Sequence, residues 1–102
     1  MTVFLQSTLQ CHGNGLSDFL GVMKMIKPIV EAAGWRLDRA FLHRTGRLHT
    51  VVDIWELEDF NSYDVGIAAL VAHPNFIDYK AVLDRTLIRE DIIFLSKTDY
   101  SP

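Results

Sequence analysis

The sequence has one cysteine, no cluster of basic residues and no long apolar run. Because Cys11 stands alone, no disulfide can form within the chain, and such cysteine usage is typical of a reducing compartment. The net charge of −3 argues against a nucleic-acid partner. No apolar stretch approaches the roughly 20 residues of a membrane span, and the N-terminus lacks a signal-peptide pattern. We therefore expect a cytoplasmic protein with no membrane span.

Several motifs that carry chemistry are also missing. The chain has neither a Gly-rich phosphate loop nor a dinucleotide fingerprint, and its four histidines lack metal-ligand spacing. The RNA-recognition pattern and a Cys-x-x-Cys pair are absent as well. Cys11 and His12 are adjacent, but neighbours in a strand point to opposite faces, so they do not form a nucleophile and base pair. We expect no metal and no cofactor.

The composition is that of a globular protein, with 49% hydrophobic and 23% charged residues. Its length suits a single domain over residues 1–102. Residues 3–11 alternate as in a strand, and a turn cluster at 12–15 follows. A helix is expected next, with Ser17 as its N-cap, Gly34 just past its end and a kink at Pro28.

Two further strands are expected at 35–43 and 48–57, joined by a three-residue loop at 44–46 with Gly46 in a left-handed conformation. This loop fixes the register: His43 then faces Arg47, Phe41 faces His49, Arg39 faces Val51 and Leu37 faces Asp53. A two-residue loop would shift every pair by one.

The rest of the chain predicts two helices and a last strand. Asp59 suits the N-cap of the first helix, and His73-Pro74 separates it from the second, with Pro74 at the first helical position. Leu87 ends the apolar line of the second helix, and 89–96 is the last strand.

This element order is that of the ferredoxin-like βαββαβ plait, an α+β fold with a four-stranded antiparallel sheet and helices on one face. Large apolar residues are expected on both faces of the strands: Trp35, Leu37, Phe41, Val51 and Trp55 on one, and Leu42, Leu48, Val52 and Ile54 on the other. An uncovered apolar face of that size is unusual in a monomer. A second copy of the chain should cover it in a two-fold homodimer, which could assemble further.

The predicted register brings Arg39, His49 and Asp53 to one apolar face as candidate catalytic residues. His49 and Asp53 lie about 13 Å apart along the strand, and Arg39 lies diagonally between them. In one interpretation Arg39 and His49 polarise an oxygen of a bound molecule while Asp53 orients it or acts as a base. In the other, an Arg39–Asp53 ion pair and a hydrogen-bonded histidine serve only the structure.

Five residues are candidates for contact with a ligand. Trp35, Phe41 and Trp55 would form apolar walls. Gln6 lies on a polar face of the first strand that either lines the cleft or forms hydrogen bonds across a dimer. Tyr79 belongs to a helix stripe, and its ring is either core or brings its hydroxyl to the cavity.

Three segments resemble the NIPSNAP family: Ala32-Ala33-Gly34-Trp35, Thr45-Gly46-Arg47-Leu48, and Val51 through Asp59 with its Asp53-Ile54-Trp55 centre. Two later segments, 68–70 and 73–79, are also similar to that family. Asp53 stands where the family often has a histidine. The resemblance implies a dimeric α/β barrel, and the wider superfamily includes cofactor-free monooxygenases, cyclases and small-molecule-binding proteins.

Together these observations predict a homodimer that binds a small, largely apolar or aromatic molecule in a cleft between sheet and helices. The alternative is a cofactor-independent enzyme, such as a monooxygenase, cyclase or isomerase, acting on an aromatic or polyketide-like substrate. A purely structural or protein-interaction module is a third hypothesis. Fold alone does not choose between them.

Overall fold

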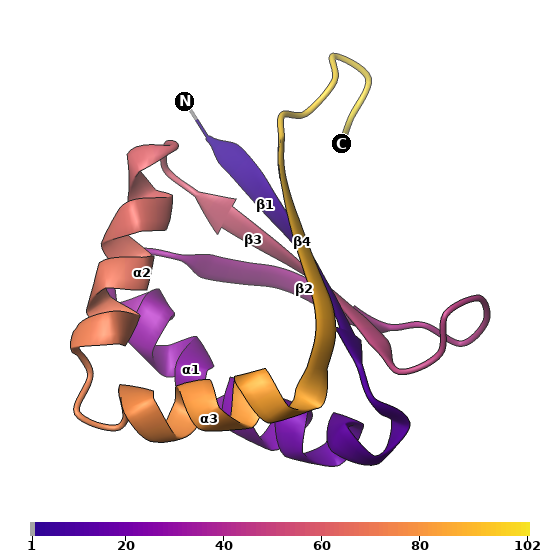
Figure 1. Cartoon of the computed structure of the whole chain (residues 1–102). Helices are drawn as coiled ribbons and strands as arrows, with labels where there is room; N and C mark the ends of the chain where they lie inside the picture. Colours follow the sequence, from indigo (N-terminus) through magenta and orange to yellow (C-terminus); the bar gives the residue numbers. More distant parts are fainter. Residues whose placement is uncertain (1) are drawn as a thin grey trace.

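The computed structural model describes residues 2–102, which form one antiparallel sheet and a layer of helices (Figure 1). In chain order the elements are β1 (Val3–Cys11), the short 3-10 turn η1 (Gly13–Gly15), α1 (Leu16–Ala32), β2 (Arg36–Leu42), β3 (Thr50–Leu57), α2 (Asn61–Ala72), α3 (Phe76–Thr86) and β4 (Leu87–Leu95). The strand order is β2-β3-β1-β4, with every neighbouring pair antiparallel. The predicted ferredoxin-like βαββαβ plait is confirmed.

The two central strands show why one face of the sheet carries the helices. In β1 the residues alternate between buried and half-buried, and the buried set is Val3, Leu5, Ser7, Leu9 and Cys11. The same alternation in β3 buries Val51, Asp53, Trp55 and Leu57. Cross-strand partners point to the same side of a sheet, and Leu5 pairs with Trp55 as Ser7 pairs with Asp53. The apolar sides of α1, α2 and α3 pack against this face.

The helix ends follow the sequence in part. Gly34 has a φ of 112°, a left-handed conformation that glycine adopts without steric cost, and it ends α1 as predicted. The N-cap position of α2 is Phe60 rather than the predicted Asp59, although Asp59 Oδ1 does accept a hydrogen bond from the Ser62 backbone N–H at 3.0 Å in the first turn. The predicted cap at Ser17 is wrong, since α1 begins at Leu16 and Gly15 precedes it without a side-chain hydrogen bond.

In the second half of the chain, both ends of α3 differ from the predicted helix boundaries. This helix begins at Phe76 rather than at Pro74, although His73 Nδ1 does accept a hydrogen bond from the Asn75 backbone N–H at 3.1 Å. Leu87 was predicted to close the helix and is instead the first residue of β4. A β-strand therefore follows α3 directly, with no loop between them.

The predicted register of the β2–β3 hairpin is wrong. The loop between these strands runs from His43 to His49, longer than the predicted 44–46, and His49 has a φ of 64°. A β-bulge between Leu37 and Arg39 then displaces the first half of the hairpin relative to the second. Arg39 faces Ile54, Ala40 faces Asp53, Phe41 faces Val52 and Leu42 faces Val51.

This register exchanges the predicted faces of Arg39, Phe41 and Leu42, whereas Leu37 before the bulge keeps its predicted face. Phe41 lies with Val52 and Ile54 on the helix-free side, while Leu37 and Leu42 lie on the side of Trp55 and Val51. The helix-free side still carries exposed apolar residues, with Phe41 55% exposed, Ile93 51% and Leu95 38%. Its ion pairs lie toward the outer strands, between Arg36 and Glu56 and between Arg89 and Asp91.

Candidate functional site

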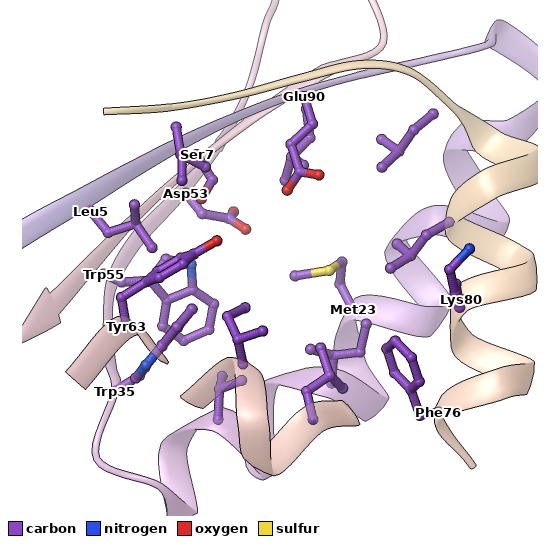
Figure 2. Close-up of a pocket in the computed structure, with 18 of the residues that line it drawn as sticks. Leu5, Ser7, Met23, Trp35, Asp53, Trp55, Tyr63, Phe76, Lys80 and Glu90 are labelled. Atoms are coloured by element: carbon purple, nitrogen blue, oxygen red, sulfur yellow. The ribbon is translucent and has the colours of Figure 1, made fainter. Parts of the chain in front are cut away.

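A cavity of about 220 Å³ lies between the sheet and the three helices (Figure 2). Its walls are mostly apolar and come from all the helices and from three strands, which is the usual construction of a small-molecule site. The sheet contributes Leu5, Ser7, Leu9, Asp53, Trp55, Leu87, Glu90 and Ile92, and the helix side contributes Met23, Ile26, Val30, Trp35, Tyr63, Ile67, Leu70, Phe76, Lys80, Leu83 and Asp84.

Asp53 is the most unusual residue of this cavity. It lies in the middle of the central strand β3, between Ala40 and Ser7, and is only 4% exposed. Its carboxylate points into the cavity (Figure 2). Among residues 2–102 no cation lies within ion-pair distance of it and no side-chain hydrogen bond reaches it. Burial therefore disfavours the charged form and raises the pKa of Asp53 from 3.8 to about 6.

A second carboxylate enters the same cavity from the edge strand β4. Glu90 pairs with Leu9, so its side chain points to the helix side of the sheet. The residue as a whole is exposed at the edge, yet Figure 2 shows its carboxylate turned into the cavity. Desolvation at that position raises the pKa of Glu90 above its ordinary value. Burial thus raises the pKa of both acidic groups in the cavity.

Three aromatic side chains form the wall at the end of α2. Trp35 and Trp55 meet edge to face, with ring centroids 5.4 Å apart, and Tyr63 stacks on Trp35 at 5.6 Å. Trp35 Nε1 donates a hydrogen bond of 2.7 Å to the Ser62 carbonyl oxygen, which fixes the indole ring. Burial raises the pKa of Tyr63, and the nearby Glu90 and Asp64 carboxylates raise it further. At neutral pH Tyr63 therefore keeps its proton and can donate a hydrogen bond.

Gly66 allows this aromatic wall to lie close to α2. A Cβ atom placed on Gly66 would overlap the indole ring of Trp35. The residue is buried within the helix, where glycine ordinarily lowers stability relative to alanine. Its presence is explained by the close approach of Trp35.

The described residues supply one cation to the wall of this cavity. Lys80 Nζ lies 2.6 Å from Asp84 Oδ2, one turn further along α3, so the two charges compensate each other. Asp53 and Glu90 remain without such a partner.

A second hollow, of about 260 Å³, lies on the β2 side of Asp53. It is lined by Phe19, Leu20, Met23, Lys24, Lys27, Leu37, Ala40, Val51, Asp53 and Trp55. The two lysines of α1 are not within ion-pair distance of Asp53, and Lys27 instead lies 3.8 Å from Glu31. Asp53, Trp55 and Met23 therefore separate two apolar spaces.

Of the residues expected at the site, the structure brings Trp35, Asp53 and Trp55 together around the cavity. Arg39 and Phe41 lie on the opposite face of the sheet, as does Gln6, which pairs with Ile54 and Ile93. The arginine therefore neither joins Asp53 in a site nor forms the ion pair with it that was the alternative.

The two remaining candidates lie elsewhere. His49 occupies the loop before β3, where its imidazole lies against Gly13. Tyr79 packs on α3 beside His73, with ring centroids 5.7 Å apart, and borders a different surface hollow next to α1.

Glu90 was missed from the sequence, although a signal for it existed. Glu90, Ile92 and Phe94 share one face of β4, so an acidic residue interrupts an apolar series. An acidic residue on the apolar face of a strand is the same signal that singled out Asp53 in β3.

Residues 2–102 offer neither a metal centre nor a membrane-spanning helix. No group of three or more histidine, cysteine, aspartate or glutamate residues there could hold a metal ion. None of the helices in that range is long and apolar enough to cross a membrane.

No protein-family model matches the sequence, and no curated protein matches it either. Solved structures do match over nearly the whole chain. An uncharacterized NIPSNAP-like domain protein from Burkholderia xenovorans has a TM-score of 0.82 and 24% identity, covering 99% of this chain and 89% of that one. A NIPSNAP family protein from Agrobacterium tumefaciens has a TM-score of 0.84 and 16% identity, covering 100% and 98%.

A third solved structure adds a protein of known reaction type. SnoaB, a cofactor-independent oxygenase from Streptomyces nogalater, has a TM-score of 0.70 and 16% identity, covering 99% of this chain and 97% of that one. At these identities the likeness concerns the fold, and fold alone does not transfer an activity. The chain shares the fold of the NIPSNAP-domain proteins, which confirms the resemblance found in its sequence.

Proposed function

We propose that this chain forms a homodimer and binds a small, largely apolar molecule in the cavity between its sheet and helices. The observation that carries the proposal is the cavity itself: about 220 Å³ of apolar space with Asp53, Glu90 and Tyr63 directed into it. In small-molecule sites of this kind, a few polar groups on otherwise apolar walls orient the ligand.

Ligand-induced thermal stabilisation tests the binding proposal. A molecule that binds the folded chain raises its melting temperature in proportion to the logarithm of ligand concentration. A library of small aromatic and alicyclic compounds should contain stabilisers, and these should lose their effect in Leu70→Trp, which fills the cavity from α2. Ile77→Trp is the matched control, because Ile77 is 80% exposed on α3 and touches no part of the cavity. Equal stabilisation of both variants would place binding elsewhere.

The homodimer proposal is supported by the helix-free face of the sheet. Phe41, Ile93 and Leu95 are exposed there beside the half-buried Val52 and Ile54, and soluble monomers rarely leave such a surface uncovered. A two-fold pairing would bring this face against its own copy. Sedimentation at micromolar concentration and physiological salt should give a dimer, and a well-folded monomer would contradict the proposal.

A cofactor-independent enzyme is the second candidate, and one observation favours it. The Asp53 pKa of about 6 is close to the pH at which a general base works best. In this mechanism the Asp53 carboxylate accepts a proton from an acidic C–H or O–H group of an aromatic or polyketide-like substrate. The substrate keeps the electron pair as a delocalised anion, and protonated Tyr63 can donate a hydrogen bond to its oxygen. SnoaB, with the same fold, is an oxygenase without a cofactor.

Solvent-exchange kinetics separate the enzyme from the binder. With aromatic ketones and phenols that the protein binds, an enzyme should exchange an acidic substrate proton for deuterium, consume oxygen, or do both. Turnover should fall at least 100-fold in Asp53→Asn, roughly the contribution of one general base, while binding persists. Ligands that bind and are returned without exchange would support binding alone.

A further inference from the structure

The cavity has an imbalance of charge that bears on the ligand it accepts. Asp53 is 4% exposed and has no partner among the described residues, while Glu90 directs a second carboxylate into the same space. Lys80, the cation of the described cavity wall, is held by Asp84 at 2.6 Å. When both acids are ionised, the cavity therefore contains two negative charges that nothing in the described chain balances.

Aromatic rings surround these acids. Trp35 contacts both Trp55, edge to face at 5.4 Å between ring centroids, and Tyr63, stacked at 5.6 Å, and Phe76 lines the cavity from α3. The faces of aromatic rings attract cations, and tryptophan does so most strongly. A carboxylate set among aromatic rings is thus complementary to an organic cation in charge and in shape.

We infer that the ligand of this cavity carries a basic nitrogen, and that its ammonium group pairs with Asp53 and Glu90 while its apolar body lies against the aromatic wall. The inference rests on the proposed binding function and names the chemical class of the ligand. An anionic ligand would meet two like charges. A neutral ligand would leave Asp53 uncompensated or require it to be protonated. A protonated amine neutralises one of the two negative charges and can donate hydrogen bonds to both carboxylates, which offsets part of the penalty of burying them.

The pH dependence of binding follows from the groups around Asp53. Those groups are Glu90 on β4, Tyr63 on α2, Lys80 and Asp84 on α3, and Lys24 and Lys27 of α1 across the second hollow. Since the pKa of Asp53 is about 6, its ionised fraction rises about tenfold between pH 5 and pH 7. An alkyl ammonium remains charged throughout that range. The ionisation of Asp53 should therefore raise amine affinity about tenfold from pH 5 to pH 7, and ionisation of Glu90 acts in the same direction.

Isothermal titration calorimetry with three probes of one shape tests this inference: phenethylamine, phenethyl alcohol and hydrocinnamate share a phenyl ring and an ethyl chain but differ in charge. At pH 7 the amine should bind at least about tenfold more tightly than the alcohol, in the range expected for a desolvated cation beside aromatic rings. The anion should bind more weakly than either. The alcohol should show no gain in affinity between pH 5 and pH 7.

Two isosteric variants and one control assign the effect to the cavity. Asp53→Asn and Glu90→Gln should each remove most of the preference for the amine, and Asp53→Asn should also reduce the pH dependence of amine binding to the part that Glu90 contributes. Asp99→Asn deletes the same charge from the exposed C-terminal tail and should change nothing. If Asp53→Asn fails to fold, Glu90→Gln and the wild-type pH profile still decide the question.

The outcomes separate this inference from the function on which it rests. If the alcohol binds in the cavity as tightly as the amine at both pH values, the ligand class is wrong and the binding proposal stands. Tighter alcohol binding at pH 5 than at pH 7 would also overturn the amine and indicate a carbonyl or hydroxyl ligand held by protonated Asp53. If no probe and no library compound binds, the proposed function itself fails.

Discussion

The two faces of the sheet differ in whether their acidic residues have a cationic partner. On the helix-free face acidic groups have cationic neighbours: Glu56 pairs with Arg36, and Asp91 lies 2.8 Å from Arg89. On the helix-covered face Asp53 has no such neighbour among the described residues and is nearly inaccessible. The paired acids of the helix-free face are ordinary surface ion pairs. An unpaired buried acid, by contrast, destabilises the fold, so its presence indicates a function.

The comparison also separates the two kinds of binding proposed for this chain. The helix-free face offers exposed apolar residues on a broad surface, which suits a second copy of the chain. The covered face offers a small, partly open cavity with directed polar groups, which suits a small molecule. Each of the following changes acts on one face and should leave the other intact.

The largest effect is expected from a charge placed on the helix-free face, at Phe41 of the edge strand β2. Phe41→Glu would put two glutamates into a two-fold interface, so the dissociation constant of the dimer should rise at least about 100-fold. Sedimentation velocity measures this. Ile77→Glu, on the exposed side of α3, is the matched control and should leave the assembly unchanged. A Phe41→Glu protein that remains fully dimeric would show that the pairing uses another surface.

The ionisation of Asp53 should make the wild-type protein less stable as pH rises. Its pKa is higher in the folded chain, about 6, than the ordinary 3.8, so the folded state binds more protons between these values. The free energy of unfolding therefore falls as pH rises from about 4 to 6, by up to about 3 kcal/mol. The raised pKa of Glu90 acts in the same direction.

Urea unfolding of wild type and Asp53→Asn at pH 4 and pH 7 measures this loss. The amide cannot ionise, so the variant should lose less stability than wild type between the two pH values. Parallel pH profiles for the two proteins would mean that Asp53 titrates normally.

Adding a methyl group at Gly66 should destabilise the covered face alone. The new Cβ would overlap Trp35, displacing the indole ring and its hydrogen bond to Ser62, at a cost of about 1–3 kcal/mol. Gly21→Ala is the matched control in α1, because nothing lies within 4 Å of a Cβ there. It should stabilise the protein by about 0.5–1 kcal/mol. Thermal unfolding distinguishes the two, and equal shifts would mean that Trp35 is not packed against α2.

The smallest effect is expected from an ion pair on the helix-free face. Arg36→Ala removes the partner of Glu56, but the arginine side chain is 63% exposed. Such surface pairs contribute at most about 1 kcal/mol, so unfolding should change by less than that. A larger loss in chemical denaturation would mean that the second copy covers this pair, whereas the expected small loss places the pair outside the contact between the two copies.

The parts of this structure that follow from short-range patterns could be predicted from the sequence. The alternation of residues 3–11 and 51–57 gives the two central strands, and the same period places Asp53 beside Trp55 on the covered face. Gly34 ends the first helix because a left-handed residue is needed there. The order of strands and helices along the chain then predicts the ferredoxin-like fold.

The register of the hairpin could not be predicted in the same way. It depends on a loop that continues to His49, whose φ of 64° has no local sequence signal, and on a bulge at Asp38. A strand has a side-chain period of two, so these features exchanged the faces of Arg39 and Phe41. The convergence of Glu90 on Asp53 depends on the pairing of β4 with β1, a long-range contact that no single segment specifies.

Titration of the Asp53 carboxyl carbon by NMR, assigned by comparison with Asp53→Asn, tests the central claim most directly. We predict a midpoint near pH 6, moving to lower pH when phenethylamine is added, because an ammonium partner stabilises the charged form. A midpoint at or below 3.8, unchanged by the amine, would mean that Asp53 is already solvated or paired, and would contradict the cavity as the functional site.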